Sequence, residues 1–428
     1  MSSLKCGVLR GVYSVLITLL LPIAFFRLWG RGRKQPGYRE AWPERLGFYR
    51  QSGRAPLIWI HAVSVGETHA AQPLVRALQA RHPQHQILLT HMTPTGRAAG
   101  KMLFGDSIVQ CYLPYDLPWA VHSFLRHYQP VIGVLMETEI WFNLSAACRA
   151  HRIPLYLVNA RMSERSARHY AWARILTREA LRGLGGIAAQ TESDAARLHS
   201  LGASAVTVTG NMKFDGEPSG DTDKADFRER FGQTRPIFLA ASTRDGEEEI
   251  VLDAFAKIAT PDLLLVIVPR HPQRFDQVAN MLRQRGIAFQ RRTGDSKVAA
   301  ATRVLLGDSM GEMAAYYAAC DVAFVGGSLL PLGGQNLIEA CAAGRPVLIG
   351  PHTFNFSKAS DSAVTAGAAL RVRDAKDLAS QVGALLADRA RAQRMGKAGI
   401  DFCAAHRGAT ARTMEILGNL TSRVDRYR

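Results

Sequence analysis

The sequence predicts an α/β protein with two similar domains behind an apolar N-terminal helix. Three observations lead to this fold class. The chain has 428 residues, which is long for one domain and enough for two hydrophobic cores. Short apolar runs alternate with helical segments from Pro56 onward, and this is the pattern of βαβ units and parallel sheets. The alternation breaks once, at Asp215–Pro236, and then resumes.

The first element is an uncharged apolar run, Val12–Phe26, between Arg10 and Arg27. As a helix it reaches about 22 Å, short of the roughly 30 Å of a bilayer core, whereas Val8–Trp29 would reach about 33 Å. No small-residue cleavage site follows, so residues 1–30 are expected to be an uncleaved membrane anchor. Pro22 and the short apolar length leave an interface-lying helix open as the alternative.

Charge supports a membrane-facing protein. The formal net charge is +17 with a pI near 10.0, so the partner is expected to be anionic: nucleic acid, a membrane surface or an acidic lipid. More basic residues follow the apolar run than precede it, which places the body in the cytoplasm. The residues after it are Arg27, Arg31, Arg33, Lys34 and Arg39, against Lys5 and Arg10 before it.

The remaining elements divide the chain into two halves. We expect a first Rossmann-like domain at 31–214, a Gly-, Pro- and charge-rich linker at 215–235, a second domain at 236–405 and a final helix within 406–428. The first-half strands are expected at LIWIHAVS, QILLTHMT, IVQCYLPYD, VIGVLME, PLYLVNA, GGIAAQ and VTVTG. Those of the second half are expected at PIFLAAST, LLLVIVPR, RVLLGDS, DVAFVGGS and PVLIGPH. Ligands of such sheets bind beyond the carboxyl ends of the strands.

In the first half, four charged residues follow strands. Glu67 lies in the first turn of a helix, where the helix dipole favours an ionised carboxylate suited to a general base; a plain helix cap is the alternative. Glu137 and Glu139 alternate in METEIW, so an extended run would place both on one face. Lys213, between apolar neighbours, is a point charge suited to a phosphate or a developing anion.

In the second half, three turns are expected to converge on a nucleotide pocket. Arg270 follows one strand, and Gly311 with Glu312 opens a helix after another. The Gly-rich turn after Val322–Val325 leads into a helix opening near Asn336, with Glu339 one turn on, placed to bind ribose hydroxyls. An ordinary strand–turn–helix with an exposed Glu is the alternative.

The cysteines and histidines indicate neither disulfides nor a metal site. The six cysteines are scattered without a CxxC pair, which is typical of reduced thiols in a cytosolic compartment. No HExxH or Cys/His ligand grouping is present, so we expect no metal and no cofactor.

Ten motifs in this order resemble the 3-deoxy-D-manno-octulosonic acid (Kdo) transferase family. They are HAVSVGET, TPTG, LPYD, METEIW, NARMSERS, TGNMKFD, VPRHPQRF, GDSMGE, FVGGSLLPLGGQNLIEA and GPHTFNF, covering nearly the whole chain. The resemblance implies a GT-B glycosyltransferase fold, two Rossmann-like domains facing across a cleft, and transfer of Kdo from CMP-Kdo to the lipid A precursor at the inner membrane. A final helix that returns to the first domain is often seen in this fold, and Ala411–Leu420 is the candidate.

The resemblance also assigns residues. It implies Glu67 as catalytic base, with Glu137 and Lys213 as transition-state stabilisers. The CMP-binding positions it implies are Pro269, Arg270, Met310, Gly311, Glu312, Asn336, Leu337, Ile338 and Glu339. Phe142 stands where the family commonly has Pro, Arg244 where His is common, and GGQNLIEA replaces GGHNPLEA, which keeps the Asn and the Glu.

Two other readings differ in class. A GT-B transferase using another nucleotide sugar, such as CMP-sialic acid or a UDP-hexosamine, would share the fold. A non-catalytic, basic membrane-associated binding protein would share the charge, but RNP-type aromatics and continuous Lys/Arg blocks are absent from the sequence, so nucleic acid is not the expected partner. No motif separates transfer of one Kdo residue from transfer of several.

Overall fold

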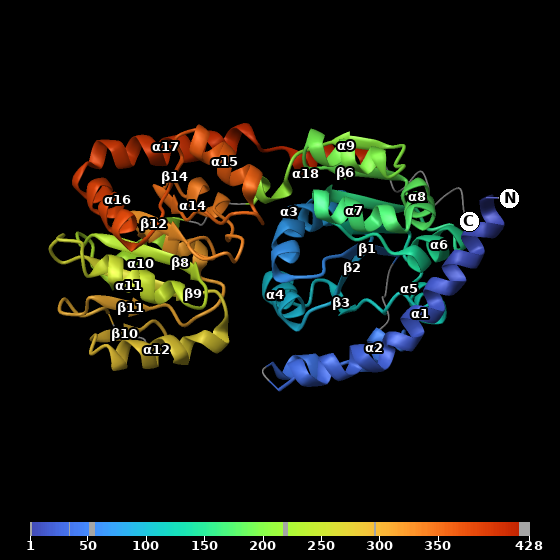
Figure 1. Ribbon diagram of the computed structural model, residues 1–428, viewed down its shortest axis with the longest axis horizontal. Helices are drawn as coiled ribbons and strands as arrows, with labels where there is room; N and C mark the ends of the chain where they lie inside the picture. Colours follow the sequence, from blue (N-terminus) through green and yellow to red (C-terminus); the bar gives the residue numbers. More distant parts are fainter. Residues whose placement is uncertain (1, 34, 51–55, 217–220, 295–296, 419–428) are drawn as a thin grey trace. The chain divides into compact units, whose positions relative to one another are not determined.

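The computed structural model describes residues 2–33, 35–50, 56–216, 221–294 and 297–418, which form two compact units (Figure 1). The first unit contains the chain up to Gly216 together with the segment from Arg407 onward, and the second contains Glu217–His406. Each unit is built on one seven-stranded parallel sheet.

The sheet of the first unit has the strand order β3-β2-β1-β4-β5-β6-β7, all parallel. Its strands are β1 (Leu57–His61), β2 (Gln86–His91), β3 (Val109–Tyr112), β4 (Ile132–Met136), β5 (Leu155–Ala160), β6 (Gly186–Ala189) and β7 (Val206–Val208). Most are buried along their whole length, as apolar strands covered on both faces should be.

Helices fill the connections of this unit. They are α1 (Ser2–Arg31), η1 (Pro36–Arg39), α2 (Trp42–Arg45), α3 (Val65–Arg81), α4 (Pro94–Phe104), α5 (Pro118–Tyr128), α6 (Phe142–Ala150), α7 (Glu164–Trp172), α8 (Arg174–Arg182), α9 (Glu192–Ser200) and η2 (Met212–Asp215). A late helix, α18 (Ala409–Leu417), packs on α3, β6 and η2 of the same unit. Asp215 caps it by accepting hydrogen bonds from the N–H groups of Gly408 and Thr410, at 2.7 and 2.6 Å. The proposed extent of this helix to Leu420 lies partly outside the described residues.

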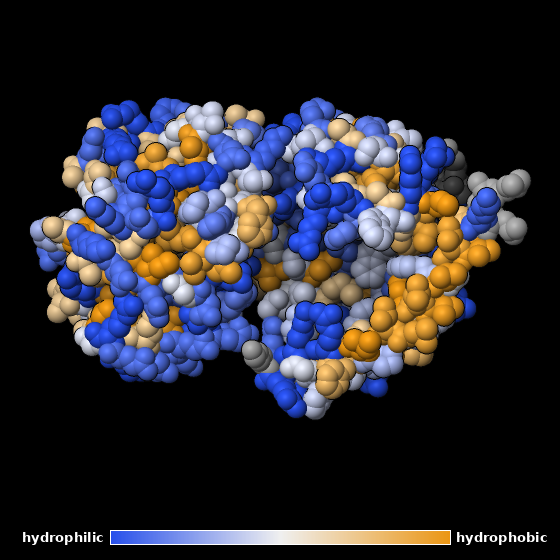
Figure 2. All heavy atoms as spheres, in the orientation of Figure 1, coloured by the Kyte–Doolittle hydropathy of each residue, from blue (hydrophilic) through white to orange (hydrophobic). Residues whose placement is uncertain are grey.

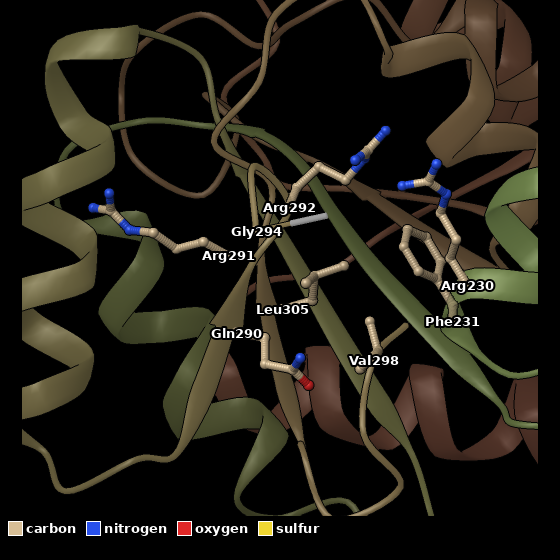
Figure 3. A pocket seen from close by; sticks show the side chains of 8 residues that line it. All are labelled: Arg230, Phe231, Gln290, Arg291, Arg292, Gly294, Val298 and Leu305. Carbon is tan, nitrogen blue, oxygen red and sulfur yellow. The ribbon is translucent and has the colours of Figure 1, made fainter. Parts of the chain in front are cut away.

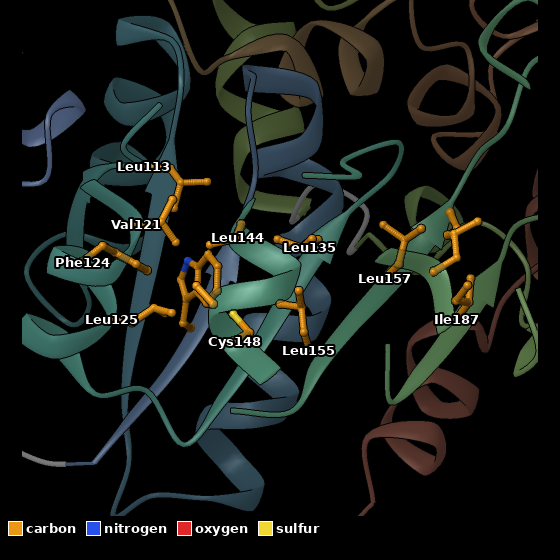
Figure 4. Close-up of a cluster of buried hydrophobic side chains, with 14 of the residues drawn as sticks. Leu113, Val121, Phe124, Leu125, Leu135, Leu144, Cys148, Leu155, Leu157 and Ile187 are labelled. Atoms are coloured by element: carbon orange, nitrogen blue, oxygen red, sulfur yellow. The ribbon is translucent and has the colours of Figure 1, made fainter. Parts of the chain in front are cut away.

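Each face of this sheet has its own core. Alternate residues of β1 point to opposite sides: Trp59 packs with Phe124 on one face, and Ile58 and Ile60 pack with helix α3 residues on the other. Figure 4 shows the first cluster, in which Leu144 and Cys148 of α6 lie between Phe124 of α5 and the strand residue Leu155. The Trp59 indole N–H donates to the Thr90 hydroxyl at 2.8 Å, so its polar atom is satisfied inside the core.

The second unit repeats the plan with the order β10-β11-β9-β8-β12-β13-β14. Its strands are β8 (Ile237–Thr243), β9 (Leu264–Pro269), β10 (Phe289–Arg291), β11 (Val304–Leu306), β12 (Val322–Val325), β13 (Val347–Ile349) and β14 (Ala369–Arg371). Its helices are α10 (Asp221–Phe231), α11 (Glu247–Phe255), η3 (Pro272–Arg274), α12 (Phe275–Gln284), α13 (Met313–Ala319), α14 (Ile338–Ala342), α15 (Ser357–Thr365), α16 (Ala375–Ala387) and α17 (Arg389–Ala405).

The segment 215–235, expected to be a linker, contains helix α10. Phe227 and Phe231 are buried and their rings contact Tyr316 of α13 at 5.0 and 6.1 Å. The charge-dense composition of this segment favoured a linker, but Phe227 and Phe231 are four positions apart, which places both on one face of a helix. Residues 217–220 lie outside the described part of the chain.

Candidate functional site

In the first unit, the candidate residues gather at the carboxyl edge of two neighbouring strands. β1 and β4 pair in parallel, so the turns that follow them emerge side by side. Glu67 lies in the first turn of α3, after β1, and Glu137 is the first residue after β4. Two carboxylates that are 70 positions apart in sequence therefore reach one site, and the charge of Glu137 helps to raise the pKa of Glu67.

Glu67 is largely buried and has few hydrogen-bond donors around it. One carboxylate oxygen accepts the Val63 backbone N–H at 2.9 Å, and the other accepts the Ser64 hydroxyl at 3.1 Å. Burial above all, and then the charges of Glu137 and Glu139, raise the pKa of Glu67 to about 8. The expected effect of the helix dipole is opposed by burial and by the neighbouring carboxylates, which together raise the pKa of Glu67. A carboxylate with a pKa near neutrality is well matched to proton removal.

Glu137 is held in an ion pair and in an unusual backbone conformation. Its φ is +58°, in the left-handed region that non-glycine residues seldom adopt. The Lys213 ammonium donates to the Glu137 carboxylate at 2.9 Å, and both side chains are mostly buried. A positive charge thus stands next to the carboxylate that faces Glu67. Strain of this kind is found at functional sites, where the surroundings hold it in place.

Lys213 is positioned by two asparagines. It lies in η2, where Asn211 caps the first turn by accepting the Lys213 N–H at 3.0 Å. Asn159, at the end of β5 with φ +51°, accepts the Met212 N–H at 3.0 Å. Asn159 was not singled out from the sequence: its side chain is fully buried and acts on the backbone beside Lys213.

Glu139 does not share a face with Glu137 as alternation predicted. The run leaves the extended conformation directly after β4, because Glu137 turns the chain. The Glu139 carboxylate accepts the indole N–H of Trp141 at 2.5 Å, and burial raises its pKa. Glu139 therefore acts on Glu67 through its charge and is not part of the group formed by Glu67, Glu137 and Lys213.

In the second unit, the candidate nucleotide residues follow neighbouring strands at the carboxyl edge. Arg270 comes directly after β9, whose last residue, Pro269, is buried. The Arg270 guanidinium donates to the Gln335 side-chain oxygen at 3.2 Å, and the charge of Glu339 acts favourably on it, although burial lowers its pKa. The turn after β9 and the turn after β12 are therefore in contact.

The segment around Asn336 differs in detail from the expectation. The helix begins at Ile338 and has only five residues, and the Asn336 amide donates to the Glu339 carboxylate at 2.8 Å. Leu337 and Ile338 have buried side chains, so only their backbone can reach a ligand. Asn336 and Glu339 do lie together, as their spacing predicted.

The turn after β11 places Met310, Gly311 and Glu312 at the same edge. Met310 is 46% exposed and Gly311 has φ +86°, a value that glycine adopts without strain. The Glu312 carboxylate is bound by the Arg292 guanidinium at 2.7 Å and by the Ser309 hydroxyl. Glu312 therefore has protein partners of its own, unlike the exposed Met310 beside it.

One carboxylate at this edge escaped the sequence reasoning. Glu247, the first residue of α11, is completely buried and accepts backbone N–H groups from Arg244, Gly327, Ser328 and Leu329. It thereby fixes the start of the Gly-rich loop that leads to Asn336. A Gly-Glu pair after the first strand of each half was the signal that could have identified it.

The described residues form no further candidate site for a ligand or a metal ion. A shallow pocket at the β10 edge is lined by arginines (Figure 3), but Arg291 pairs with Asp276 and Arg292 with Glu312. Within the described residues, no group of three or more His, Cys, Asp or Glu side chains is arranged to hold a metal ion.

Comparison with known proteins gives a consistent result. Residues 40–216 match the family model of 3-deoxy-D-manno-octulosonic-acid transferase (kdotransferase), and residues 221–402 match that of glycosyl transferases group 1. A 3-deoxy-D-manno-octulosonic acid transferase of Bordetella pertussis is 47% identical over 95% of this chain and 98% of its own. The enzyme of the same name from Haemophilus influenzae is 39% identical over the same shares.

The solved structures show the fold. The UDP-GlcNAc 2-epimerase of Neisseria meningitidis superimposes with a TM-score of 0.59 at 16% identity, over 85% of this chain and 99% of that one. At that identity the likeness concerns architecture alone. Together with the two parallel sheets, it establishes the GT-B type of fold.

Proposed function

Because this chain belongs to the 3-deoxy-D-manno-octulosonic-acid (Kdo) transferase family, we propose that it moves Kdo from CMP-Kdo onto the lipid A precursor, lipid IVA, with Glu67 as the base. The chain is a glycosyltransferase that transfers Kdo in lipopolysaccharide biosynthesis. What is proposed is the acceptor, the inverting course of the reaction and the role of each residue.

The observation that carries the proposal is the group formed by Glu67, Glu137 and Lys213. A base for a sugar hydroxyl must lose its own proton near neutral pH and still be basic enough to take another. With its pKa raised to about 8, Glu67 is ionised in part at neutral pH and is a stronger base than an ordinary carboxylate. Glu137 helps to raise that value, and the Glu137 carboxylate is itself paired with the Lys213 ammonium at 2.9 Å.

The proposed reaction is a single displacement. Glu67 takes the proton of the acceptor's glucosamine 6′-hydroxyl, and the oxygen forms a bond to the anomeric carbon of Kdo. The bond from that carbon to the phosphate oxygen breaks, and CMP leaves with the electron pair. Attack opposite the leaving group inverts the anomeric centre. Lys213 supplies a cation for the negative charge that develops.

The second unit is proposed to hold the CMP moiety. Arg270 is a half-buried cation for the phosphate, and the backbone of the segments around Gly311 and Leu337 offers N–H donors. The Glu339 carboxylate is the proposed acceptor of ribose hydroxyls. No metal and no cofactor is assigned to this reaction.

The acceptor is a membrane lipid, so the enzyme is proposed to work on the cytoplasmic face of the inner membrane. The helix α1 is the one described helix that is long and apolar enough to cross a bilayer. The net charge of +17 favours a surface of anionic headgroups and a donor sugar that carries a carboxylate.

The experiment is a defined transfer reaction. Purified full-length protein is incubated with CMP-Kdo and lipid IVA, and the products are weighed by mass spectrometry. A product heavier by one or more Kdo residues, with release of CMP, is expected. Parallel reactions with CMP-sialic acid and a UDP-hexosamine should give none; a product from either of those donors in place of CMP-Kdo would contradict the proposal.

A further inference from the structure

The helix α1 packs lengthwise against the first unit. Its buried and half-buried residues recur every three or four positions from Cys6 to Leu28, which is one face of a helix. Over these positions the helix is about 33 Å long, the full thickness of a bilayer core. The part of α1 that is long enough to span a membrane therefore packs against the folded first unit.

These contacts are specific and partly polar. The Tyr13 hydroxyl donates at 2.9 Å to Asp116, a buried carboxylate that also accepts the backbone N–H groups of Asn143 and Leu144 at the start of α6. The Ser14 hydroxyl bonds to the Asn143 side chain. Toward the N-terminus, Arg10 lies 3.7 Å from the Glu179 carboxylate of α8.

Aromatic contacts continue the packing at the other end. The Phe25 ring lies 5.1 Å from Trp42 and 6.0 Å from Tyr115. If α1 crossed the bilayer perpendicular to its plane, these contacts would be lost, and the buried Asp116 carboxylate would lose one of its donors.

The opposite face of α1 is a continuous apolar stripe. Its residues are 40–71% exposed: Val8, Leu9, Val12, Val15, Leu16, Leu19, Leu20, Ile23 and Phe26. Figure 2 shows hydrophobic side chains gathered along this helix. An exposed patch of this extent is rare on soluble proteins and marks an interaction surface.

Cations and interfacial aromatics border the stripe. Exposed arginines follow its C-terminal end, where the Arg33 guanidinium lies 4.6 Å from the Trp29 ring. On α8, which packs against α1, Ile175 is exposed, and Trp172, the last residue of α7, is 92% exposed. The same two helices carry five exposed basic residues: Arg165, Arg168, Arg174, Arg178 and Arg182. Apolar and cationic groups together fit an anionic lipid surface.

We propose that α1 does not span the membrane but lies in the plane of its cytoplasmic leaflet, with the stripe Val8–Phe26 in the acyl boundary and the α7–α8 corner as a second contact. This inference rests on the proposed function only in that the membrane contacted is the one that contains the acceptor lipid. Both ends of α1 then lie on the same side of the bilayer.

Topology can be tested with single cysteines, because all six native cysteines are buried. Lys5→Cys and Gly30→Cys mark the two ends of α1, both exposed. In sealed inside-out inner-membrane vesicles, a membrane-impermeant maleimide is expected to label both. Labelling of Lys5→Cys only after detergent is added would show that α1 spans the membrane and would overturn the proposal.

Lipid contact can be tested with the double variant Leu16→Glu, Leu19→Glu, and with Ile400→Glu as the matched control, an apolar residue 50% exposed in the second unit. Binding to vesicles of phosphatidylethanolamine and phosphatidylglycerol (3:1) should fall about tenfold or more in the stripe variant, and not in the control. Unchanged binding, or a changed oligomeric state with binding retained, would refute lipid as the occupant.

The same variants separate this inference from the proposed function. Transfer of Kdo to lipid IVA dispersed in detergent micelles should be unchanged in the stripe variant, since the stripe is outside the Glu67 site. Loss of vesicle binding with transfer retained supports the in-plane arrangement. Absence of transfer in the unaltered protein would refute the proposed function and leave the vesicle result standing.

Discussion

The two units place a Gly-Glu pair in the same turn and use the carboxylate differently. Glu67 follows β1 and Glu247 follows β8, and each lies in the first turn of a helix. Both strands are interior strands of their sheets. Glu247 is completely buried and accepts four backbone N–H groups. Glu67 accepts one backbone N–H and one hydroxyl, with two other carboxylates nearby.

The difference indicates what separates a structural carboxylate from a reactive one. A carboxylate has about four lone-pair sites. In Glu247 all of them accept backbone N–H groups, three from the Gly-rich loop and one from Arg244. Glu67 keeps sites for a substrate hydroxyl, and its burial without matching donors raises its pKa to about 8. We expect removal of charge to affect catalysis at Glu67 and folding at Glu247.

The largest effect is expected from Glu67→Gln. The amide keeps the size of the side chain but cannot take a proton, so kcat should fall roughly 10²- to 10⁴-fold. CMP binding, measured by calorimetry, should be unchanged because the proposed CMP residues belong to the second unit. Glu192→Gln, an exposed Glu in the first turn of α9, is the control and should retain full activity. Retained turnover in Glu67→Gln would refute the base assignment.

The next largest effect is expected from Glu247→Gln. The amide has one acceptor oxygen and brings two N–H donors toward a set of donors, so the second unit should lose about 2–4 kcal/mol of unfolding free energy. Because the loop from Gly327 leads to Asn336, the KM for CMP-Kdo should rise severalfold. Urea unfolding and steady-state kinetics measure the two effects.

The neighbour Glu249 provides the control for this variant. It belongs to the same helix turn but is exposed, so Glu249→Gln should change stability by no more than about 0.5 kcal/mol. If Glu247→Gln were as mild as Glu249→Gln, the four N–H contacts would not be what holds the loop, and the contrast with Glu67 would lose its basis.

The comparison also predicts that Glu67→Gln and Glu247→Gln change the unfolding free energy in opposite directions at pH 8. The pKa of Glu67 is raised from 4.5 to about 8 by folding, so wild-type unfolding free energy should fall as pH rises between these values. Glu67→Gln removes this loss and should be more stable than wild type at pH 8, by about 1–2 kcal/mol, with little difference at pH 5. Urea midpoints at the two pH values measure it. A destabilised Glu67→Gln at pH 8 would make Glu67 a structural cap like Glu247.

The sequence predicted the two parallel sheets because buried strands and their helices have plain apolar periods. It placed Glu67 and Glu137 at strand ends, where parallel order brings them together. It did not predict the left-handed turn at Glu137, since no glycine marks it, nor the role of Asn159, which depends on β5 lying beside the chain before Lys213. Desolvation of Glu67 likewise depends on tertiary packing. The position of α1 against the body could not be read from hydropathy alone.

The smallest expected effect is on the pH profile. Since the base must be deprotonated, kcat/KM of the wild type should rise with pH through about 8. Glu139 contributes to this high value through its charge, so Glu139→Gln should move the rising limb to lower pH by less than one unit. Glu164→Gln, an exposed carboxylate in α7, should leave the limb in place. A limb that stays fixed in Glu139→Gln, or moves to higher pH, would mean that Glu67 does not sense this carboxylate. The smaller number of hydrogen-bond donors around Glu67 would then be what distinguishes it from Glu247.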